Sequence, residues 1–210
     1  MFRWLKSLLF AVVAATVLVA PVQATDTALL NVSYDVARDF YKDYNPLFQK
    51  YWKAKTGETV ELKQSHGGSS KQVRAVADGL EADVVTMNQA SDVDFLVEKG
   101  LVAKDYATKY SNNASPYTST MVFIVRKGNP KGLKDWSDLV ASGVQVILPH
   151  PKNTGNGRYS YLAAWGYALK QPGGNDKTAQ EFVGKLLKNA PLFTAGGRDA
   201  TTTFMQRKIG

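Results

Sequence analysis

Residues 59–79, TVELKQSHGGSSKQVRAVADG, contain the pattern that decides the fold. Thr59–Leu62 is predicted as a strand, Ser65–Ser70 is a turn of small residues, and Lys71–Asp78 is predicted as a helix that Gly79 ends. The same order of strand, small-residue turn and helix recurs along the chain. Because strands that alternate with helices are typical of the α/β class, the sequence predicts an α/β protein.

The alternation continues on both sides of this stretch. Strands are predicted over residues 29–34, 83–86, 118–126 and 144–148 and from Phe193, and helices over 92–99, 133–140, 158–169, 177–189 and 201–207. Asn45-Pro46 has the character of an N-cap followed by a first-turn proline. We therefore expect one helix to begin at Val36 and a second to run from this pair through Trp52, with Gly57 as its stop. A polar stretch at 112–116 marks a crossover between two domains.

The composition is that of a globular protein. The chain has 210 residues, of which 44% are hydrophobic and 21% charged, and this excludes a wholly disordered or collagen-like molecule. It contains no cysteine, so thiol catalysis, zinc ribbons and a disulfide framework are excluded. The formal charge of +8 is consistent with an anionic ligand, although net charge alone speaks to steering and not to a site.

The N-terminus is predicted to be a signal peptide over residues 1–24. Arg3 and Lys6 give it a positive start, Leu8–Ala20 is an uncharged apolar run, and Val22-Gln23-Ala24 has small residues where a signal peptidase cleaves. The alternative, a membrane anchor, needs an apolar run of about 20 residues, and this run is shorter. We therefore expect a mature protein that begins at Thr25 in a bacterial periplasm.

Small-residue turns before helices are the main candidates for a binding site. They are Ser65–Ser70, Asn153–Gly157, Ala195–Thr201 and Ser33–Asp35. Such turns present free backbone N–H groups at the positive end of a helix, where an anion can approach. Each one alone is also compatible with an ordinary α/β turn. Since neither a G-x-x-x-x-G-K-[ST] nor a G-x-G-x-x-G motif occurs, a small anion is favoured over a nucleotide.

No catalytic, metal or cofactor site is predicted. His66 and His150 stand alone in the sequence and are interpreted as turn residues, and no serine lies in a G-x-S-x-G motif. The basic residues Arg126, Lys127 and Lys131 are too sparse for nucleic-acid binding. An exported enzyme acting on a small anionic substrate remains the alternative class of function.

Aromatic residues recur at helical spacing in one segment, and we predict that they face the core. They are Tyr41, Tyr44, Phe48, Tyr51 and Trp52.

Several stretches carry a family resemblance. They are Leu30–Asp35, Gln64–Gln72, Gly79–Thr86, Val125–Pro130, Tyr161–Gly166 and Ala200–Phe204. On these stretches the chain resembles the periplasmic sulfate- and thiosulfate-binding proteins of ABC importers. Thr86–Gln89 and Gly155–Tyr159 lean toward the thiosulfate-binding branch, and the choice between the two anions stays open.

The resemblance implies a two-lobed periplasmic binding protein of type II-like fold, with residues 25–112 in the first lobe and 113–210 in the second. It is expected to be a monomer that delivers its anion to the membrane permease subunits of the importer. The anion-binding residues carried over from the family are Asp35 (through its backbone), Ser69, Thr154, Gly155, Asn156 and Gly197.

Departures from the family pattern also follow from the resemblance. Thr154 stands where serine is usual, His150 replaces asparagine, Asn153 replaces threonine, and Asp199 replaces glycine. Asp199 would add a carboxylate near an anion turn. Family members continue past the position of Gly210 to complete both lobes and to supply an indole N–H to the anion. The chain is therefore expected to be a C-terminally truncated member, and a nonfunctional fragment is the alternative.

Overall fold

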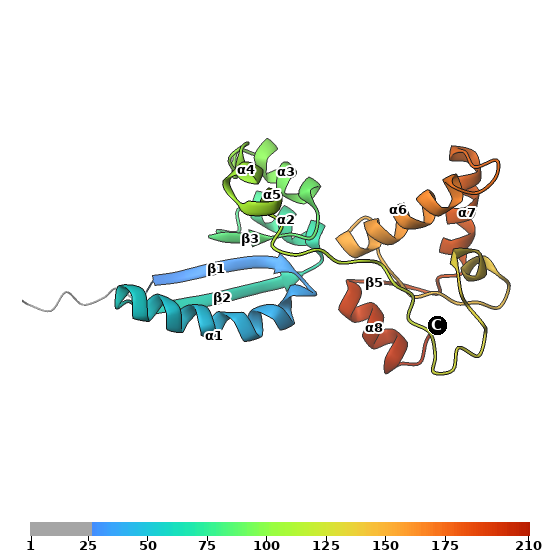
Figure 1. Cartoon of the computed structure of the whole chain (residues 1–210), viewed down its shortest axis with the longest axis horizontal. Helices are drawn as coiled ribbons and strands as arrows, with labels where there is room; N and C mark the ends of the chain where they lie inside the picture. Colours follow the sequence, from blue (N-terminus) through green and yellow to red (C-terminus); the bar gives the residue numbers. More distant parts are fainter. Residues whose placement is uncertain (1–26) are drawn as a thin grey trace, which may run out of the picture.

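The computed structural model describes residues 27–210 (Figure 1). The predicted signal peptide at 1–24 lies outside the described residues. Within 27–210, none of the helices has both the length and the apolar character needed to cross a membrane. The described chain forms two groups of elements, which we call the first lobe (β1 to α5) and the second lobe (η1 to α8).

A parallel sheet organises the first lobe. Its strands are β1 (Thr27–Tyr34), β2 (Val60–Gly67) and β3 (Val84–Thr86), in the order β2-β1-β3. All pairs are parallel, and Val32 of β1 lies opposite both Ser65 and Val85. The central strand is covered on both sides, so that Val32 and Ser33 are fully buried. This arrangement confirms the predicted α/β class.

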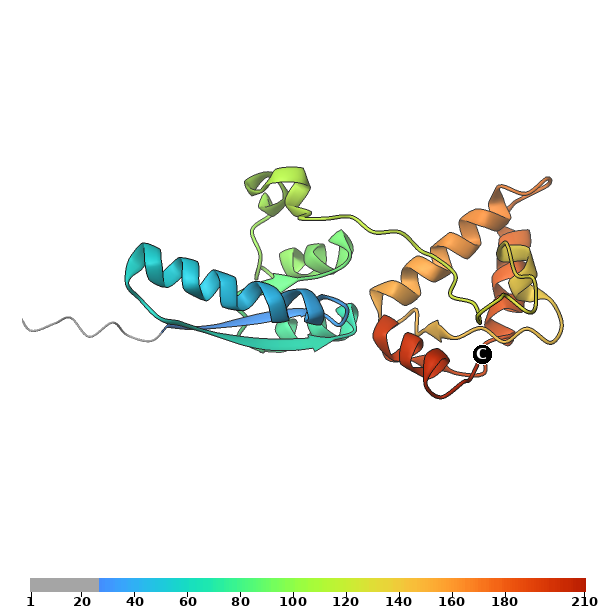
Figure 2. The same cartoon turned by 60° about the horizontal axis from the view of Figure 1, so that its bottom comes forward.

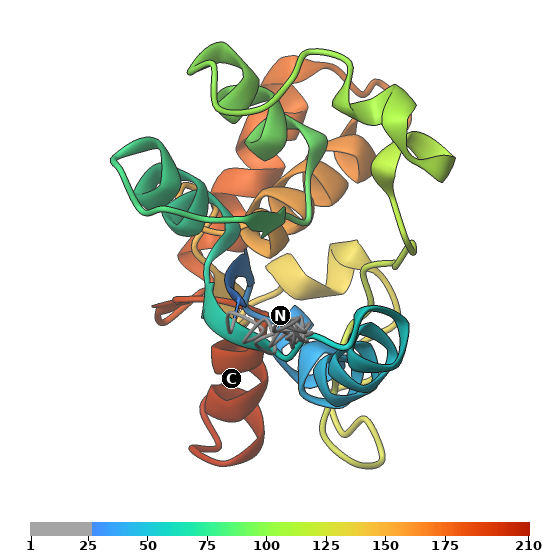
Figure 3. The same cartoon turned by 90° about the vertical axis from the view of Figure 1, so that its left-hand side faces the viewer.

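Helices cover both faces of this sheet. Figure 3 shows α1 (Ala37–Thr56) and α2 (Ser69–Ala77) on different sides of β1 and β2. They are followed by α3 (Ala90–Glu98) and by two short helices, α4 (Tyr106–Lys109) and α5 (Ser111–Ala114).

Helix α1 corrects one prediction about boundaries. Residues 37–56 form a single helix with Pro46 inside it, and not two helices separated at Asn45-Pro46. Gly57 does end the helix, in a left-handed conformation with φ of 80°, because glycine lacks the Cβ that makes this conformation costly.

The aromatic residues of α1 do not all face the core. Tyr44 and Tyr51 are 44% and 55% exposed, which contradicts the prediction for them. The side chains at positions 40, 44, 48 and 52 instead stack along the helix surface, with ring centroids 5.3, 6.3 and 6.0 Å apart. Helical spacing predicted a shared face correctly but could not say whether anything covers that face.

One extended segment connects the lobes. Residues 115–126 pass from α5 to the second lobe (Figure 2) without joining a sheet of the described chain. The predicted strand at 118–126 is therefore wrong for this structure. Its apolar side chains are correspondingly open, with Val122 70% and Ile124 54% exposed.

The second lobe is built mainly of helices. It contains η1 (Trp136–Val140), α6 (Gly155–Leu169), α7 (Asp176–Lys188) and α8 (Gly197–Met205), with β4 (Leu148–Pro149) and β5 (Phe193–Thr194) paired in parallel. Of the predicted strand at 144–148, only Leu148 lies in a strand. The predicted helix at 133–140 is a 3₁₀ helix that begins at Trp136. Leu139, Ala164, Val183 and Leu186 form the core of the lobe.

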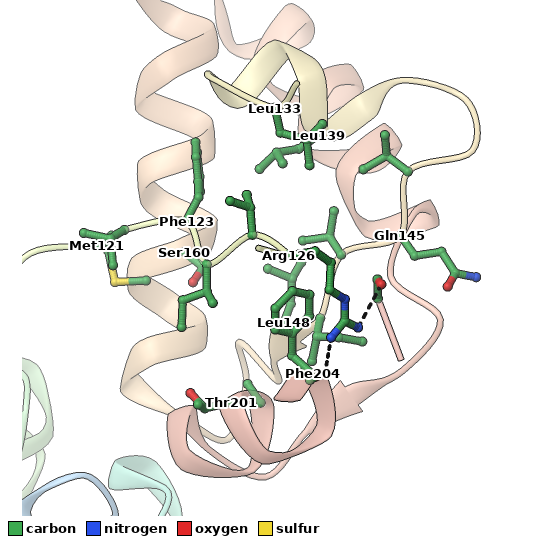
Figure 4. Close-up of a pocket in the computed structure, with 18 of the residues that line it drawn as sticks. Met121, Phe123, Arg126, Leu133, Leu139, Gln145, Leu148, Ser160, Thr201 and Phe204 are labelled. Carbon is green, nitrogen blue, oxygen red and sulfur yellow. Dashed lines mark hydrogen bonds between the residues drawn. The ribbon is translucent and has the colours of Figure 1, made fainter. Parts of the chain in front are cut away.

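A hollow of about 340 Å³ opens beside this core (Figure 4). Residues 120–126 form one wall, and η1 and α8 contribute to the others. Arg126 lies over the Phe204 ring at 3.8 Å from its centroid and donates a hydrogen bond of 2.6 Å to the Phe204 carbonyl. The connecting segment is thereby attached to α8.

Replacing Pro46 tests the continuity of α1. Pro46→Ala restores the N–H that proline lacks inside a helix, and part of the gain is offset because the unfolded chain becomes more flexible. We expect the free energy of unfolding to rise by about 2 kcal/mol in urea titrations. The control Lys50→Ala, at an exposed position of the same helix, should change it by less than about 0.5 kcal/mol. A destabilised Pro46→Ala variant would contradict a continuous helix.

Candidate functional site

Five helices begin at the boundary between the lobes. Each described strand leads at its carboxyl end into a helix: β1 into α1, β2 into α2, β3 into α3, β4 into α6 and β5 into α8. Because the strands within each sheet are parallel, their carboxyl ends lie at the same edge. In Figure 1 the arrowheads of β1 and β2 point toward the second lobe, where α6 and α8 begin.

The turns from the two lobes approach each other closely. A Cβ on Gly68 would lie 2.6 Å from the carbonyl oxygen of Asn153 and 3.2 Å from that of Ala195. A Cβ on Gly196 would lie 3.3 Å from a carboxylate oxygen of Asp35. The four turns singled out in the sequence therefore come together, and glycine at these positions permits the approach.

Side chains leave most of these helix starts uncapped. Helices α1, α2, α3 and α8 have no side-chain hydrogen bond at their N-caps, whereas Thr154 caps α6 by accepting from the Gly157 N–H at 2.9 Å. First-turn N–H groups have no partner inside their own helix, and the macrodipole adds positive potential there. The arrangement is suited to a small anion.

Asp35 lies at the start of α1 beside the second lobe. Its carboxylate accepts a hydrogen bond of 3.3 Å from Arg38, and the N-cap of α1 is Val36. The Asp35 side chain makes no capping hydrogen bond to the start of α1. The ion pair with Arg38 places a cation beside this carboxylate at the edge of the site.

Ser69 is the first residue of α2 and is 1% exposed. Its Oγ accepts a hydrogen bond of 3.4 Å from the Asn88 N–H and lies 3.6 Å from the Met87 sulfur. Both interactions are long or weak, so the hydroxyl can donate to another acceptor.

Thr154 has a different position in the site. Its N–H and its hydroxyl both donate to the His150 carbonyl at 3.0 Å, so neither donor is directed at a ligand in this structure. Thr154 shapes the turn that starts α6, and its assignment as an anion-binding residue stays a prediction.

Gly155, Asn156 and Gly197 lie together on the second-lobe side of the boundary, at the starts of α6 and α8. Gly155 is packed against the Asn88 side chain, and the Asn156 side chain is packed against Gly197. Gly155 and Gly197 are the first residues of α6 and α8, where N–H groups are free of intrahelical bonds.

Asp199 does not add a free carboxylate to the turn. It accepts a hydrogen bond of 3.0 Å from the Ala195 N–H, so it closes the loop that precedes α8. The expected effect on the site is therefore the loss of one backbone donor, at Ala195.

The sequence did not identify three residues that bridge the lobes. Asn88 donates from Nδ2 to Asn156 Oδ1 at 2.9 Å, and its backbone carbonyl accepts from the Tyr159 hydroxyl at 2.8 Å. Gln89 donates to the Gly155 carbonyl at 3.4 Å. All three belong to the stretches that lean toward the thiosulfate-binding branch. Their resemblance to that branch was the signal in the sequence that could have drawn attention to them. It does not predict contacts between residues about 70 positions apart.

Two ion pairs also join the lobes. Arg158 of α6 donates to Asp92 of α3 at 2.6 Å, and the Asp92 side chain is 3% exposed. Arg198 of α8 lies 3.2 Å from Asp39 of α1, with both side chains more than half exposed.

A polar cluster lies behind the site at the ends of β1 and β2. Ser33 Oγ and His66 Nδ1 are 2.6 Å apart, and the hydroxyls of Tyr34 and Tyr117 are also 2.6 Å apart. Burial lowers the pKa of His66, and the nearby Arg38 lowers it further, while Asp35 opposes the change. Burial and the hydrogen bond to Tyr117 raise the pKa of Tyr34.

No metal centre is found in the described part of the chain, residues 27–210, where no group of three or more His, Asp or Glu side chains could hold an ion. His150 accepts a hydrogen bond of 3.2 Å from the Lys152 N–H and lies in the turn before α6. This position agrees with the interpretation of His150 as a turn residue, whereas that interpretation is wrong for His66, which lies within β2.

A sequence model for bacterial extracellular solute-binding proteins matches residues 33–209. The chain belongs to this family. The match covers both lobes and all of the turns described above.

Individual relatives give the same result. The chain is 66% identical over 183 residues to a thiosulfate-binding protein of Pseudomonas aeruginosa and 48% identical over 210 residues to a sulfate-binding protein of Escherichia coli. The matches cover 87% and 100% of this chain, and they span 55% and 62% of the lengths of these relatives. The resemblance inferred from the sequence is confirmed.

A solved structure confirms the fold. The sulfate-binding protein SubI of Mycobacterium tuberculosis superimposes with a TM-score of 0.77 at 32% identity, covering 87% of this chain and 62% of that chain. The chain therefore has the two-lobed α/β fold of periplasmic solute-binding proteins.

The two bridging ion pairs should differ in strength. Asp92→Ala leaves the Arg158 guanidinium without its carboxylate partner. Because Arg158 is partly exposed, we expect the free energy of unfolding to fall by about 2–3 kcal/mol. The matched control Asp39→Ala removes the exposed pair and should cost less than about 0.5 kcal/mol. Urea titration of both variants measures this, and equal effects would contradict the buried role of Asp92.

The pKa of His66 predicts a pH dependence of stability. Because its folded-state pKa lies below the unfolded value, the unfolded chain binds the proton more readily, and stability falls as the pH drops below about 6.5. We expect a lower melting temperature at pH 5.5 than at pH 8, and a smaller decrease in His66→Gln. The control His150→Gln retains His66 and should keep the full decrease. An unchanged decrease in His66→Gln would assign the effect to other groups.

Proposed function

We propose that the chain is the receptor of an ABC importer, that it captures sulfate or thiosulfate between its two lobes, and that it catalyses no reaction. The observation that carries the proposal is the meeting of five helix N-termini at the lobe boundary, four of them without side-chain caps. The proposed anion-binding residues are Asp35 (through its backbone), Ser69, Thr154, Gly155, Asn156 and Gly197. The names of the two bacterial relatives support this choice of anions.

The chemistry of the site would select anions by their protonation. Sulfate and thiosulfate are fully ionised near neutral pH, so they only accept hydrogen bonds, and a site lined by N–H and O–H donors satisfies them. Phosphate carries at least one O–H at this pH. Burying that donor against other donors costs roughly 1–3 kcal/mol for each unpaired group. The Asp35 carboxylate could accept such a proton, but its ion pair with Arg38 competes for this role.

Closure of the lobes would be the output of binding. A ligand stabilises the closed form only through contacts that the open form lacks, so donors from both lobes are required. Ser69 comes from the first lobe, and Gly155, Asn156 and Gly197 come from the second. The hydrogen bonds and ion pairs of Asn88, Gln89 and Asp92 would add to the closed form.

Export and delivery complete the proposal. The chain would be exported to the periplasm with cleavage after Ala24, and it would act as a monomer with lobes at 25–112 and 113–210. Its partners would be the membrane permease subunits of the importer, which would recognise the closed form.

Thermal melting of the chain from Thr25 onward tests the proposal. Sulfate, thiosulfate, phosphate and chloride are compared at one ionic strength. An anion present at 100 times its dissociation constant should add about 2.7 kcal/mol to the free energy of unfolding. We expect a rise in melting temperature with sulfate or thiosulfate and none with chloride. An equal rise with phosphate would contradict selection by protonation, and no rise with either proposed anion would overturn the function.

Gly155→Asp tests the position of the site. The new carboxylate would repel the anion at the start of α6 and would collide with the Asn88 side chain, so we expect the anion-dependent rise to disappear. Gly166→Asp is the matched control, since it adds the same group to the same helix at a position with no neighbouring atom within 4 Å. Anion binding that persists in Gly155→Asp would show that the site lies elsewhere.

A further inference from the structure

Asn88 contacts three of the proposed anion-binding residues, Ser69, Gly155 and Asn156. Its N–H donates to Ser69 Oγ at 3.4 Å, and its side-chain Nδ2 donates to Asn156 Oδ1 at 2.9 Å. Its side chain also packs directly against Gly155. Asn88 therefore joins the anion turn of the first lobe to that of the second.

One atom of Asn88 is unsatisfied. Its Oδ1 is buried and has no hydrogen-bond partner among residues 27–210, although it lies against the first residue of α6. A buried acceptor without a donor destabilises the folded chain, so such an atom in a native site calls for a ligand or a rearrangement.

Exchange of roles between the two amides turns this unsatisfied acceptor into a donor. The oxygen and nitrogen ends of a carboxamide have nearly the same shape, so Asn88 and Asn156 can both rotate by 180°. Asn156 then donates to Asn88, and the bond between them is kept. The Asn88 NH₂ group moves to the position of the unsatisfied oxygen, beside Gly155 at the start of α6, and would donate to an anion bound there.

We propose that the side-chain amide of Asn88 is an additional anion-binding donor, contributed by the first lobe through the junction of β3 and α3. This inference rests on the proposed function. The amide differs from the backbone donors, which are fixed by their helices, because it makes its contact only after the lobes have brought Asn88 and Asn156 together. Asn88 thus couples anion binding to closure.

Asn88→Asp separates this role from that of a structural bridge. The Asn156 amide can turn and donate to a carboxylate, so the bridge between the lobes survives the substitution. The anion, however, meets a negative charge in place of a donor. A bridging role predicts unchanged binding in this variant, and a donor role predicts a loss.

The experiment is calorimetric titration with sulfate and with thiosulfate at pH 8 and pH 5, using the chain from Thr25 onward. For Asn88→Asp we expect an affinity at least roughly tenfold lower at pH 8, the size of a lost hydrogen bond to a charged group. The loss should be smaller at pH 5, because burial and the neighbouring anion raise the pKa of the new carboxyl, and protonation then removes the charge and restores a donor. The control Asn113→Asp adds the same charge at an exposed position and should bind as the parent chain does.

Nuclear magnetic resonance gives a second readout that needs no change of charge. The side-chain amide signals of Asn88, assigned by their disappearance in Asn88→Ala, should shift on addition of sulfate and not of chloride. Signals that do not move, or parent-like affinity in Asn88→Asp at pH 8, would overturn the inference. A parent chain that binds neither anion would instead overturn the proposed function, so the two failures are distinguishable.

Discussion

Parallel pairing of β1 with β2 and β3 is the constraint on which the rest of the structure depends. It forces every chain crossing to run through a helix and brings the carboxyl ends of the strands to one edge. The next helix then starts at that edge, with its unpaired N–H groups at the strand end. The second lobe repeats the design with only two residues in each strand, so the position of the helix start matters more than the length of the strand.

Close approach of backbone to backbone is the second requirement. Gly68, Gly155 and Gly196 lie where a Cβ would meet atoms of the opposite lobe. Side chains at these positions would hold the turns apart and leave room for water among the donors. Glycine is needed at these positions because it has no side chain. Its freedom to adopt positive φ matters instead at Gly57, where α1 ends.

Backbone and side chains have different roles around this edge. Backbone N–H groups carry partial positive charge without a formal cation, so a dianion can be held without a buried salt bridge. Two carboxylates near the edge are paired with arginines, Asp35 with Arg38 and Asp92 with Arg158. The second of these pairs joins the lobes, whereas the amide of Asn88 lies among the turns themselves.

The sequence by itself determined the local units of strand, small-residue turn and helix, as in residues 59–79. It could do so because the conformational preferences of glycine and proline, and the signals that end a helix, depend only on neighbouring residues. It therefore predicted the α/β class and four of the turns that meet at the boundary. Tertiary structure alone decided which faces are covered, which is why Tyr44 is exposed and residues 118–126 form no strand. It also decided the contact of Asn88 with Asn156, since residues 68 positions apart meet only after both lobes have folded and come together.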